Sequence, residues 1–277
     1  MNLKSYALKR LSENHGTDKN IAKNIAKFLE STDRIEAAKV SRPIEFKSKI
    51  EVLIPCYNQG EFLEEAVNSL VNQTSKVPLY ITLINDGSTD NTAQYMKIIQ
   101  ATFNSSQFDI KIITNEKNLL QAGSLNKAIS ESKNELFIVL NSDDLLTKDC
   151  LDLIIETYTQ NDDIFLLGGS SIWFESGQEL PYHKPKKISN LKLKKFGPRD
   201  VNGFSHTNSI NITHSSSSFY KSAWRLVGGY LPLEERVCSH DDRDFQMRVC
   251  SLLPIGIYQD YPMAYYRTDS SLGRGNI

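Results

Sequence analysis

Residues 50–58 have the sequence IEVLIPCYN, and residues 79–87 have the sequence LYITLINDG. Both stretches begin with a nearly continuous apolar run, which ends at Pro55 in the first and at Asn85 in the second. The run ELFIVL at residues 135–140 is likewise followed by polar residues. Short apolar runs bounded by turn residues predict strands that are buried on both faces of a sheet.

Amphipathic segments separate these predicted strands. Residues 62–71 place their apolar side chains at helical spacing on one stripe, and residues 122–129 repeat the pattern. Two more helices are expected from about residues 90 and 148, and two more strands at residues 110–113 and 164–167. Alternating strands and helices with short connections predict an α/β fold, in which helices flank an open, mainly parallel sheet.

The two ends of the chain differ from this alternating region. Residues 1–40 are predicted to be helical, because their apolar side chains recur at helical spacing. After Gly168 the periodic signals weaken, and residues 241–253 form the one clear helical pattern. We therefore expect an N-terminal helical extension at residues 1–45 and one large domain at residues 46–277.

The composition is that of an ordinary globular protein, with 40% hydrophobic and 23% charged residues in a chain of 277. A net charge of −1 gives no bias towards nucleic acid, so no nucleic-acid partner is expected. The apolar runs are too short to span a bilayer, and the N-terminus lacks the apolar core of a signal peptide. A cytoplasmic location is therefore expected. The four cysteines have no spacing typical of zinc sites or disulfides.

Polar residues follow three of the predicted strands at their carboxyl ends. Tyr57 and Asn58 follow the first strand, residues 85–90 (NDGSTD) follow the second, and residues 141–144 (NSDD) follow the strand at 135–140. In open α/β sheets, ligands bind beyond the carboxyl ends of the strands. Turn chemistry explains any one of these clusters alone. Three clusters at one edge predict a binding site.

Two of these clusters carry carboxylates. Asp86 precedes a glycine that permits close approach, so its carboxylate could accept a hydrogen bond from a pyrimidine N–H. Asp143 and Asp144 would repel each other without a counter-charge, and such oxygen ligands suit Mg²⁺ or Mn²⁺ that holds substrate phosphates. The structural alternatives are a capping loop without a ligand around Asp86, and one capping and one solvated aspartate in the pair.

Asp241 and Asp242 open the late helix, directly after His240. The helix dipole favours carboxylates in a first turn, which is a purely structural explanation for both. The same dipole keeps a carboxylate ionised and oriented. Asp242 is therefore equally a candidate general base that takes a proton from a sugar hydroxyl.

Together these motifs resemble those of family-2 glycosyltransferases with the GT-A fold. The opening strand of that family, with its P-x-Y-N end, corresponds to residues 51–58, and its D-D-G-S-T-D block to residues 85–90. Its D-x-D-like metal motif is matched by residues 142–144 and its G-G-F/Y block by residues 228–230. Its E-D-x-x-L-x-x-R helix is matched by residues 241–248. A looser match to its N-x-G-x-x-x-A-x-N block places Asn118, Gly123 and Asn126 at shifted spacing.

The resemblance covers roughly residues 48–268 and implies an inverting, metal-dependent glycosyltransferase of the hexosyltransferase class. The implied donor is a nucleotide diphosphate sugar, with UDP expected, and the implied cofactor is Mn²⁺ or Mg²⁺. The implied acceptor is a glycan or a lipid-linked saccharide, in bacterial surface polysaccharide synthesis. The nucleotide-binding half would cover about residues 48–168 and the acceptor-binding half about residues 169–277.

The resemblance also implies a role for each matching residue. Asp144, with Asp143 beside it, would coordinate the metal that binds the diphosphate. Asp242, with Asp241 beside it, would deprotonate the acceptor during a direct displacement at the anomeric carbon. Asp86 would contact the nucleobase. The residues expected to bind the nucleotide are Pro55, Tyr57, Asn58, Asp86, Gly123 and Asp143.

Four positions depart from the family pattern. Asn85 stands where the family often has a first aspartate, Leu125 where it often has arginine, and Asp241 where it has glutamate. Asp269 replaces the histidine of a Y-R-x-H motif near the C-terminus, which leaves any phosphate or metal role of that histidine without support.

The acceptor side is less clear from the sequence. His214, His240 and Trp224 are candidates for the acceptor site. Both tryptophans, Trp173 and Trp224, are expected mainly in the core, and stacking on a pyranose face is the alternative for either. The basic stretch Lys184–Arg199 contains no acidic residue. It is expected to be a solvated, mobile acceptor-side loop, and peripheral contact with anionic lipid at the inner face of the membrane is the alternative.

Two other function classes stay open at this point. A sugar-nucleotide nucleotidyltransferase would use a similar sheet, but a Gly-rich phosphate loop with a basic residue is expected after its first strand, and residues 55–58 (PCYN) do not match one. A non-catalytic nucleotide- or glycan-binding module is the other class, and Asp144 and Asp242 argue against it.

Overall fold

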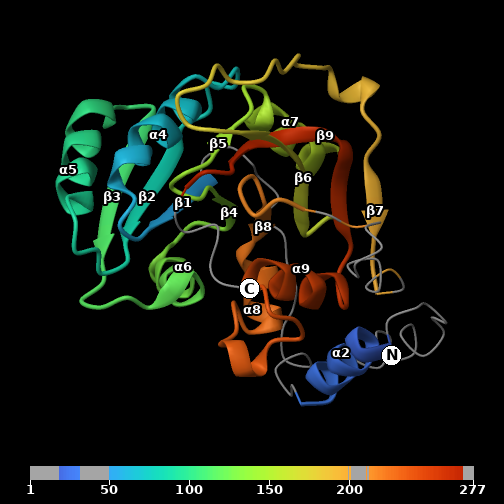
Figure 1. Ribbon diagram of the computed structural model, residues 1–277. Helices are drawn as coiled ribbons and strands as arrows, with labels where there is room; N and C mark the ends of the chain where they lie inside the picture. The colour runs from blue at the N-terminus through green and yellow to red at the C-terminus, as the bar shows by residue number, and fades with distance from the viewer. Residues whose placement is uncertain (1–18, 32–49, 199, 201–209, 211, 271–277) are drawn as a thin grey trace.

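The computed structural model describes residues 19–31, 50–198, 200, 210 and 212–270, and it shows an α/β fold built around one sheet (Figure 1). Its strands are β1 (Ile50–Cys56), β2 (Leu79–Asn85), β3 (Phe108–Thr114), β4 (Leu136–Val139), β5 (Leu145–Leu146), β6 (Leu166–Phe174), β7 (Lys194–Phe196), β8 (Ser218–Tyr220) and β9 (Ile255–Arg267). Within this part of the chain the strand order is β3-β2-β1-β4-β8-β6-β9-β5, and β7 pairs with β9.

The half of the sheet made by β3, β2, β1 and β4 is parallel throughout. Ile50 at the start of β1 lies opposite both Leu79 and Leu136, so the neighbouring strands start level. Their following loops therefore meet at one edge of the sheet. The prediction of a mainly parallel sheet flanked by helices is confirmed, and the first four predicted strands lie close to the observed bounds.

Helices cover both faces of this sheet. They are α2 (Lys19–Ser31), α4 (Leu63–Val71), α5 (Thr92–Phe103), α6 (Leu120–Glu131), α7 (Cys150–Gln160), α8 (Lys221–Val227) and α9 (Asp241–Cys250), with short 3-10 turns η1 (Gly60–Phe62), η2 (Ile188–Asn190) and η4 (Leu233–Glu235). One hydrophobic cluster joins α4, α5 and α7 to one face, and a second joins α2, α6, α8 and α9 to the other.

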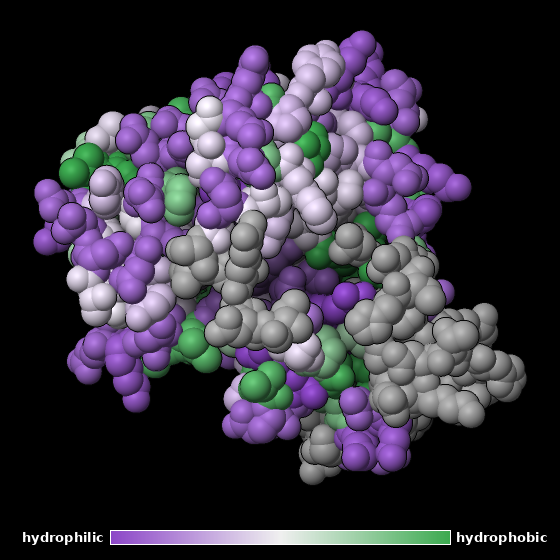
Figure 2. Space-filling view, viewed as in Figure 1, coloured by the Kyte–Doolittle hydropathy of each residue, from purple (hydrophilic) through white to green (hydrophobic). Residues whose placement is uncertain are grey.

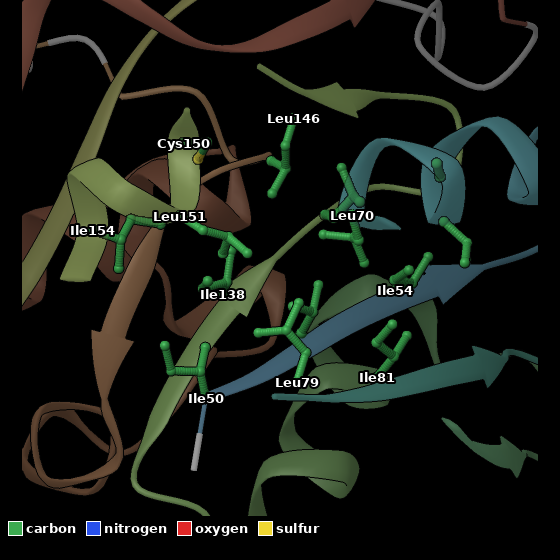
Figure 3. Packing of buried hydrophobic residues seen from close by; sticks show 14 of the residues in the cluster. Ile50, Ile54, Leu70, Leu79, Ile81, Ile138, Leu146, Cys150, Leu151 and Ile154 are labelled. Atoms are coloured by element: carbon green, nitrogen blue, oxygen red, sulfur yellow. The ribbon is translucent and has the colours of Figure 1, made fainter. Parts of the chain in front are cut away.

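The alternation of side chains along β1 divides its residues between these two clusters. Ile54 belongs to the first cluster and lies on the same side of the sheet as Leu70 (Figure 3), whereas Leu53 belongs to the second. Both side chains are wholly buried. Period-two alternation into two apolar layers explains why the run at residues 50–56 is apolar throughout.

The C-terminal part of the sheet contains more regular structure than the sequence predicted. β9 pairs in parallel with β6 and antiparallel with β5 and β7, and it is the longest of the described strands. The expectation of little regular structure after Gly168 is wrong here. β9 contains Pro262 and the polar residues Gln259 and Asp260, and its pairing with β6 shifts register near Ser170. Such a strand has no clean local period, because distant partners stabilise it.

A buried arginine of α9, paired with an aspartate on the same helix, joins α9 to the end of α8. Arg248 and Asp244 are both wholly buried, and Arg248 Nη2 lies 2.6 Å from Asp244 Oδ2. The guanidinium also donates to the carbonyl oxygens of Val227 (2.7 Å) and Gly229 (2.8 Å). Gly228 and Gly229 have φ values of 78° and 77°, which favour glycine. The glycine pair and the arginine of α9 are thus two sides of one junction, which sets where α9 begins.

Helix α2 packs on the domain. Ile25 and Leu29 are wholly buried in the cluster that includes α9, and Asn24 Nδ2 donates to the Val237 carbonyl oxygen (3.2 Å). The expected helix before α2 falls at residues 1–18, outside the described residues. The boundary proposed at residue 45 also lies outside them and stays a prediction.

Candidate active site

A cavity of about 400 Å³ opens at the carboxyl ends of β1, β2 and β4. The three polar clusters that follow these strands meet there, as expected for parallel strands that start level. Two carboxylates contribute to its lining, and no lysine or arginine among the described residues does so. The lining residues are Pro55, Cys56, Tyr57, Gln59, Asp86, Asn118, Leu120, Gln121, Asn141, Ser142, Asp143 and Tyr266.

Four of the six residues expected to bind the nucleotide line this cavity, and two lie behind it. Gly123 is in the first turn of α6, where a Cβ would lie 2.9 Å from Leu119 Cβ. Asn58 Oδ1 accepts a hydrogen bond from the Thr89 N–H (2.8 Å), which ties the loop after β2 to the end of β1. Both residues shape the site without facing it. The four that line the cavity are Pro55, Tyr57, Asp86 and Asp143.

Asp86 is held in one orientation at the end of β2. Its Oδ1 accepts hydrogen bonds from the Leu119 N–H (2.8 Å) and from Asn115 Nδ2 (3.0 Å). No described residue donates to Oδ2, so this oxygen can accept from a ligand. Gly87 has a φ of 71°, and a Cβ there would lie 2.6 Å from the carbonyl carbon of Lys117. The glycine therefore lets the two loops approach and keeps Asp86 in place.

Asp143 and Asp144 are neighbours with different surroundings. Asp143 is half-buried and lines the cavity, and its Oδ2 accepts a hydrogen bond from Gln59 Nε2 (3.1 Å). Asp144 is 1% exposed and does not line the cavity. Its Oδ2 accepts from Ser215 Oγ (2.5 Å), and its Oδ1 accepts from the Arg267 N–H (2.9 Å). The position predicted for Asp144, facing a metal, therefore disagrees with its surroundings.

Burial also changes the chemistry of Asp144. Loss of solvent raises the pKa of its carboxyl to about 7, and the charge of Asp143 acts in the same direction. The hydrogen bonds from Ser215, Arg267 and Asn141 oppose this shift but are weaker than burial. Asp144 thus holds the loop after β4 through these hydrogen bonds, and Asp143 is the carboxylate of the pair that lines the cavity. The metal role of Asp144 stays a prediction.

Arg267 at the end of β9 holds the loop after β4 that contains Asp143 and Asp144, called the acidic loop below. Its guanidinium is nearly inaccessible, donates through Nε to the Asp143 carbonyl oxygen (2.8 Å) and pairs with Glu65 on α4 (2.6 Å). The guanidinium also lies over the Phe174 ring, 4.5 Å from its centroid. The arginine of the predicted Y-R motif therefore positions the Asp143 and Asp144 backbone and does not enter the cavity.

Asp269, which replaces the family histidine, has a structural role here. Both of its oxygens accept a hydrogen bond from the Ser176 N–H at 3.0 Å. This bond closes the turn that follows β6. Asp269 does not line the cavity, so a phosphate or metal role does not pass to this residue.

The first turn of α9 lies near the cavity without lining it. Asp241 and Asp242 are half-buried, and Asp241 lies 4.0 Å from Arg236 Nη2. Tyr266 lines the cavity, and its pKa is raised by burial and then by the charges of Asp144, Asp143 and Asp242. Asp242 is therefore within electrostatic reach of the same phenol group as the acidic loop. The role of Asp242 as the base stays a prediction.

The three acceptor candidates occupy different environments. His214 is buried, and its Nε2 lies 3.2 Å from the Tyr230 hydroxyl. Trp224 is half-buried and donates through Nε1 to Asn126 Oδ1 (2.9 Å), which ties α8 to α6. His240 is exposed at the start of α9. None of the three lines the cavity, and the contacts of His214 and Trp224 are those of structural residues.

Sequence reasoning assigned no individual role to the amide side chains of Gln59, Gln121 and Asn141, which line the cavity. Gln59 accepts from Ser142 Oγ (2.8 Å) while it donates to Asp143. Asn141 Oδ1 accepts from Gln121 Nε2 (2.6 Å). The sequence did contain a signal for Asn141. The D-x-D-like spacing also fits Asn141-Ser142-Asp143, and its first and third residues both line the cavity.

This arrangement is that of the GT-A class, with a mostly parallel sheet and carboxylates at its carboxyl edge. The chain belongs to glycosyl transferase family 2, because the sequence model of that family matches residues 51–223. The resemblance inferred from its motifs is therefore confirmed at the level of the family.

Curated relatives share this assignment but are longer. A glycosyltransferase of Haemophilus influenzae is 32% identical over 121 residues, which cover 43% of this chain and 35% of the relative. A glycosyltransferase of Methanocaldococcus jannaschii is 28% identical over 207 residues, which cover 73% of this chain and 64% of the relative. The chain thus spans between about a third and two thirds of these proteins.

Solved structures agree on the fold. The S. aureus TarS fragment 1-349 in complex with UDP-GlcNAc matches with a TM-score of 0.59 and 17% identity, over 83% of this chain and 62% of that one. A mannosyltransferase of Pyrobaculum calidifontis in complex with GDP-Man and Mn²⁺ matches with a TM-score of 0.56 and 12% identity, over 95% and 68%. At these identities the similarity establishes the fold alone.

The visible surface is mainly polar. Hydrophilic residues predominate on the face shown in Figure 2, with apolar residues in small patches. Among the described residues, no helix has both the length and the apolar character needed to cross a bilayer.

Proposed function

We propose that this chain is an inverting glycosyltransferase of the hexosyltransferase class, which uses a UDP-sugar and a glycan or glycolipid acceptor. The observation that carries the proposal is the cavity at the carboxyl edge of the sheet, where Asp86 and Asp143 face one volume of about 400 Å³. Bacterial surface polysaccharide synthesis is the proposed setting. Chondroitin and hyaluronan synthases of Pasteurella multocida, each 30% identical over 40% of this chain, support a polysaccharide product.

The donor nucleotide would bind at the β1 and β2 side of the cavity. Asp86 offers Oδ2, which no described residue binds, to the N–H of a pyrimidine base. Tyr57 and Pro55 line the same region and provide apolar and aromatic surface for the base. The similarity to TarS, whose structure contains UDP-GlcNAc, supports uracil as the base.

The electrostatics of the cavity favour a divalent cation. A diphosphate would meet Asp86 and Asp143, with no basic side chain among the described lining residues to offset its charge. Mg²⁺ and Mn²⁺ are commonly held by one or two carboxylates together with substrate phosphates. The residues present fit that pattern, because Asp143 reaches the cavity, whereas Asp144 is enclosed. When bound, the cation would neutralise charge on the departing diphosphate.

The proton of the acceptor would pass to the first turn of α9. Asp242 takes the proton from an acceptor hydroxyl while that oxygen forms a bond to the anomeric carbon of the donor sugar. The bond from the anomeric carbon to the diphosphate oxygen breaks at the same time, so configuration inverts and the nucleoside diphosphate leaves. The helix dipole at the start of α9 favours a carboxylate in this first turn. His240, exposed beside it, is the remaining acceptor candidate.

Thermal unfolding in the presence of UDP, GDP, dTDP and CDP, each with and without Mn²⁺, tests the donor site. A nucleotide at about 100 times its dissociation constant should add roughly 2.7 kcal/mol of stability. We expect UDP with Mn²⁺ to give the largest shift, and Asp86→Ala to reduce it. A shift from GDP alone would overturn the choice of uracil. No shift with any nucleotide would overturn the proposed function and favour a glycan-binding module.

Peripheral membrane contact through the basic stretch Lys184–Arg199 stays a prediction. Lys184 and Lys187 are exposed, and Lys195 pairs with Asp163 (2.8 Å). Binding to vesicles with and without anionic lipid would test it, and equal binding to both would remove it.

A further inference from the structure

Trp173 is exposed, although the sequence predicted it in the core. Its side chain is 72% accessible, so the prediction is wrong at this position. It lies near the end of β6, with its backbone paired to β9. Scattered exposed apolar side chains are common on protein surfaces, so exposure alone assigns no role. The surroundings of this ring provide the further information.

Trp173 lies beside the active-site cavity. It is paired in register with Tyr266 on the parallel strand β9, so the two side chains project from the same face of the sheet. Their ring centroids are 6.4 Å apart with an interplanar angle of 51°. Tyr266 itself lines the cavity that contains Asp143. The indole therefore continues the aromatic surface of Tyr266 outwards from the cavity.

The end of β6, which carries the exposed ring, is packed on its other face. The next residue, Phe174, is buried and packs edge-on against Tyr265, with ring centroids 6.3 Å apart. The Arg267 guanidinium covers Phe174 and also holds the acidic loop after β4. Trp173 thus belongs to the same packed unit as the catalytic edge. An aromatic side chain on such a strand gives a large contact area at a low cost in conformational entropy.

We propose that Trp173 forms an acceptor subsite, where the indole stacks on a pyranose ring of a saccharide acceptor. The inference rests on the proposed function and adds the chemical class of the acceptor at the position next to the reacting sugar. Tyr266 would separate the two sugars, since it lies between Trp173 and the cavity. The C–H face of a pyranose is apolar and matches an exposed indole, and the half-buried Ser171, on the same face two residues earlier, offers a hydroxyl group to the sugar rim.

The fluorescence of the protein offers a direct test, because the chain has only two tryptophans. Wild type and Trp173→Phe, both with UDP and Mn²⁺ bound, would be titrated with methyl glycosides of glucose, galactose, mannose and N-acetylglucosamine. We expect at least one glycoside to change the emission of the wild type, and Trp173→Phe to lose that change. Absence of any change in the nucleotide-bound wild type would overturn the subsite.

Binding and kinetics of variants separate this inference from the proposed function. Trp173→Ala should weaken glycoside binding, or raise the acceptor KM where transfer is measured, by about tenfold, while Trp173→Phe restores part of the loss. UDP binding by Trp173→Ala should match the wild type. Tyr182, 84% exposed on the segment after β6, provides the matched control, and Tyr182→Ala should change neither quantity.

Each outcome points to one conclusion. If the wild type binds no nucleotide, the proposed function fails. If the wild type binds nucleotide but Trp173→Ala loses it, Trp173 belongs to the donor site and the acceptor assignment is overturned. If glycoside affinity and acceptor KM are unchanged in Trp173→Ala, the subsite is overturned while the transferase proposal stands.

Discussion

Asp143 and Asp144 differ in the number of donors that their carboxylates already bind. Asp144 accepts from Ser215 and from the Arg267 backbone inside the protein, whereas Asp143 accepts from Gln59 and faces the cavity. Adjacent residues after a strand point in different directions, so a shared motif cannot give both the same role. The role of metal ligand therefore suits Asp143.

Exchange of each aspartate should separate these roles. Asp143→Asn should remove the part of UDP stabilisation that depends on Mn²⁺, because the amide is a much weaker cation ligand. Without ligand, its unfolding free energy should stay within about 0.5 kcal/mol of the wild type, as for most partly exposed positions. Thermal unfolding with UDP, with and without Mn²⁺, measures both quantities. Asp144→Asn is the matched control and should keep the Mn²⁺ effect. Loss of the Mn²⁺ effect in Asp144→Asn, with the effect kept in Asp143→Asn, would identify Asp144 as the metal ligand.

The base assignment makes a kinetic prediction. Asp242→Asn should lower kcat by about 10²–10⁴-fold, since it removes general base catalysis and leaves the shape of the side chain nearly unchanged. UDP affinity should not change, because Asp242 does not line the cavity. Transfer assays at saturating donor give kcat, and the neighbouring Asp241→Asn provides the comparison. A larger loss in Asp241→Asn than in Asp242→Asn would move the base to Asp241.

At the scale of elements, the junction between α8 and α9 anchors the helix that carries Asp242, the proposed base. Arg248 binds Asp244 on its own helix and two carbonyl oxygens at the end of α8, Val227 and Gly229. This geometry connects the glycine pair and the helix arginine, which are far apart in the sequence. Each motif is therefore needed to orient the first turn of α9, although neither reaches the substrate cavity.

Removal of one partner from this junction should destabilise the protein strongly. Arg248→Met leaves the Asp244 carboxylate buried without its counter-charge, a change that costs about 3–5 kcal/mol. Urea unfolding measures the loss. The double variant with Asp244→Leu should recover part of it, because no uncompensated charge remains. Equal stability of the single variant and the wild type would mean that the buried pair contributes nothing net.

The elements that the sequence predicted well are those whose signal is local. β1, β2 and β4 are continuous apolar runs, and α4 carries its apolar stripe within residues 62–71, so neighbours in the chain suffice to identify them. β9 lacks such a signal, because its polar residues and Pro262 are accommodated by pairing with β6 and by a register shift. Long-range pairing of that kind has no local pattern.

The site was predicted at the level of clusters rather than of individual orientations. The carboxyl ends of parallel strands specify where polar loops meet, which explains why Pro55, Tyr57, Asp86 and Asp143 line one cavity. Whether a loop side chain faces the cavity depends on packing from the distant strand β9. The enclosure of Asp144 by Arg267 and the exposure of Trp173 both arise in this way.

At the scale of the whole molecule, β9 connects the cavity, the loop with Asp143 and Asp144, and the exposed Trp173. Its end carries Tyr266 in the cavity wall, Arg267 under the acidic loop, and the partner of Trp173. Movement of this strand would displace all three together. Residues of β9 belong to both hydrophobic clusters, one on each side of the sheet. The position of the site therefore depends on the packing of the whole domain.

Helix α2 is part of the same packed body, and a single substitution tests this. Leu29 is wholly buried in the cluster that contains α9 residues such as Phe245 and Val249. Leu29→Ala should therefore lower the free energy of global unfolding by about 2–5 kcal/mol, as for other buried leucines. Urea unfolding followed by circular dichroism and by fluorescence should give one shared, shifted transition. A separate early transition with the main one unchanged would instead mean that residues 1–45 form an independent extension, since α2 would then unfold without disturbing the α9 side of the sheet.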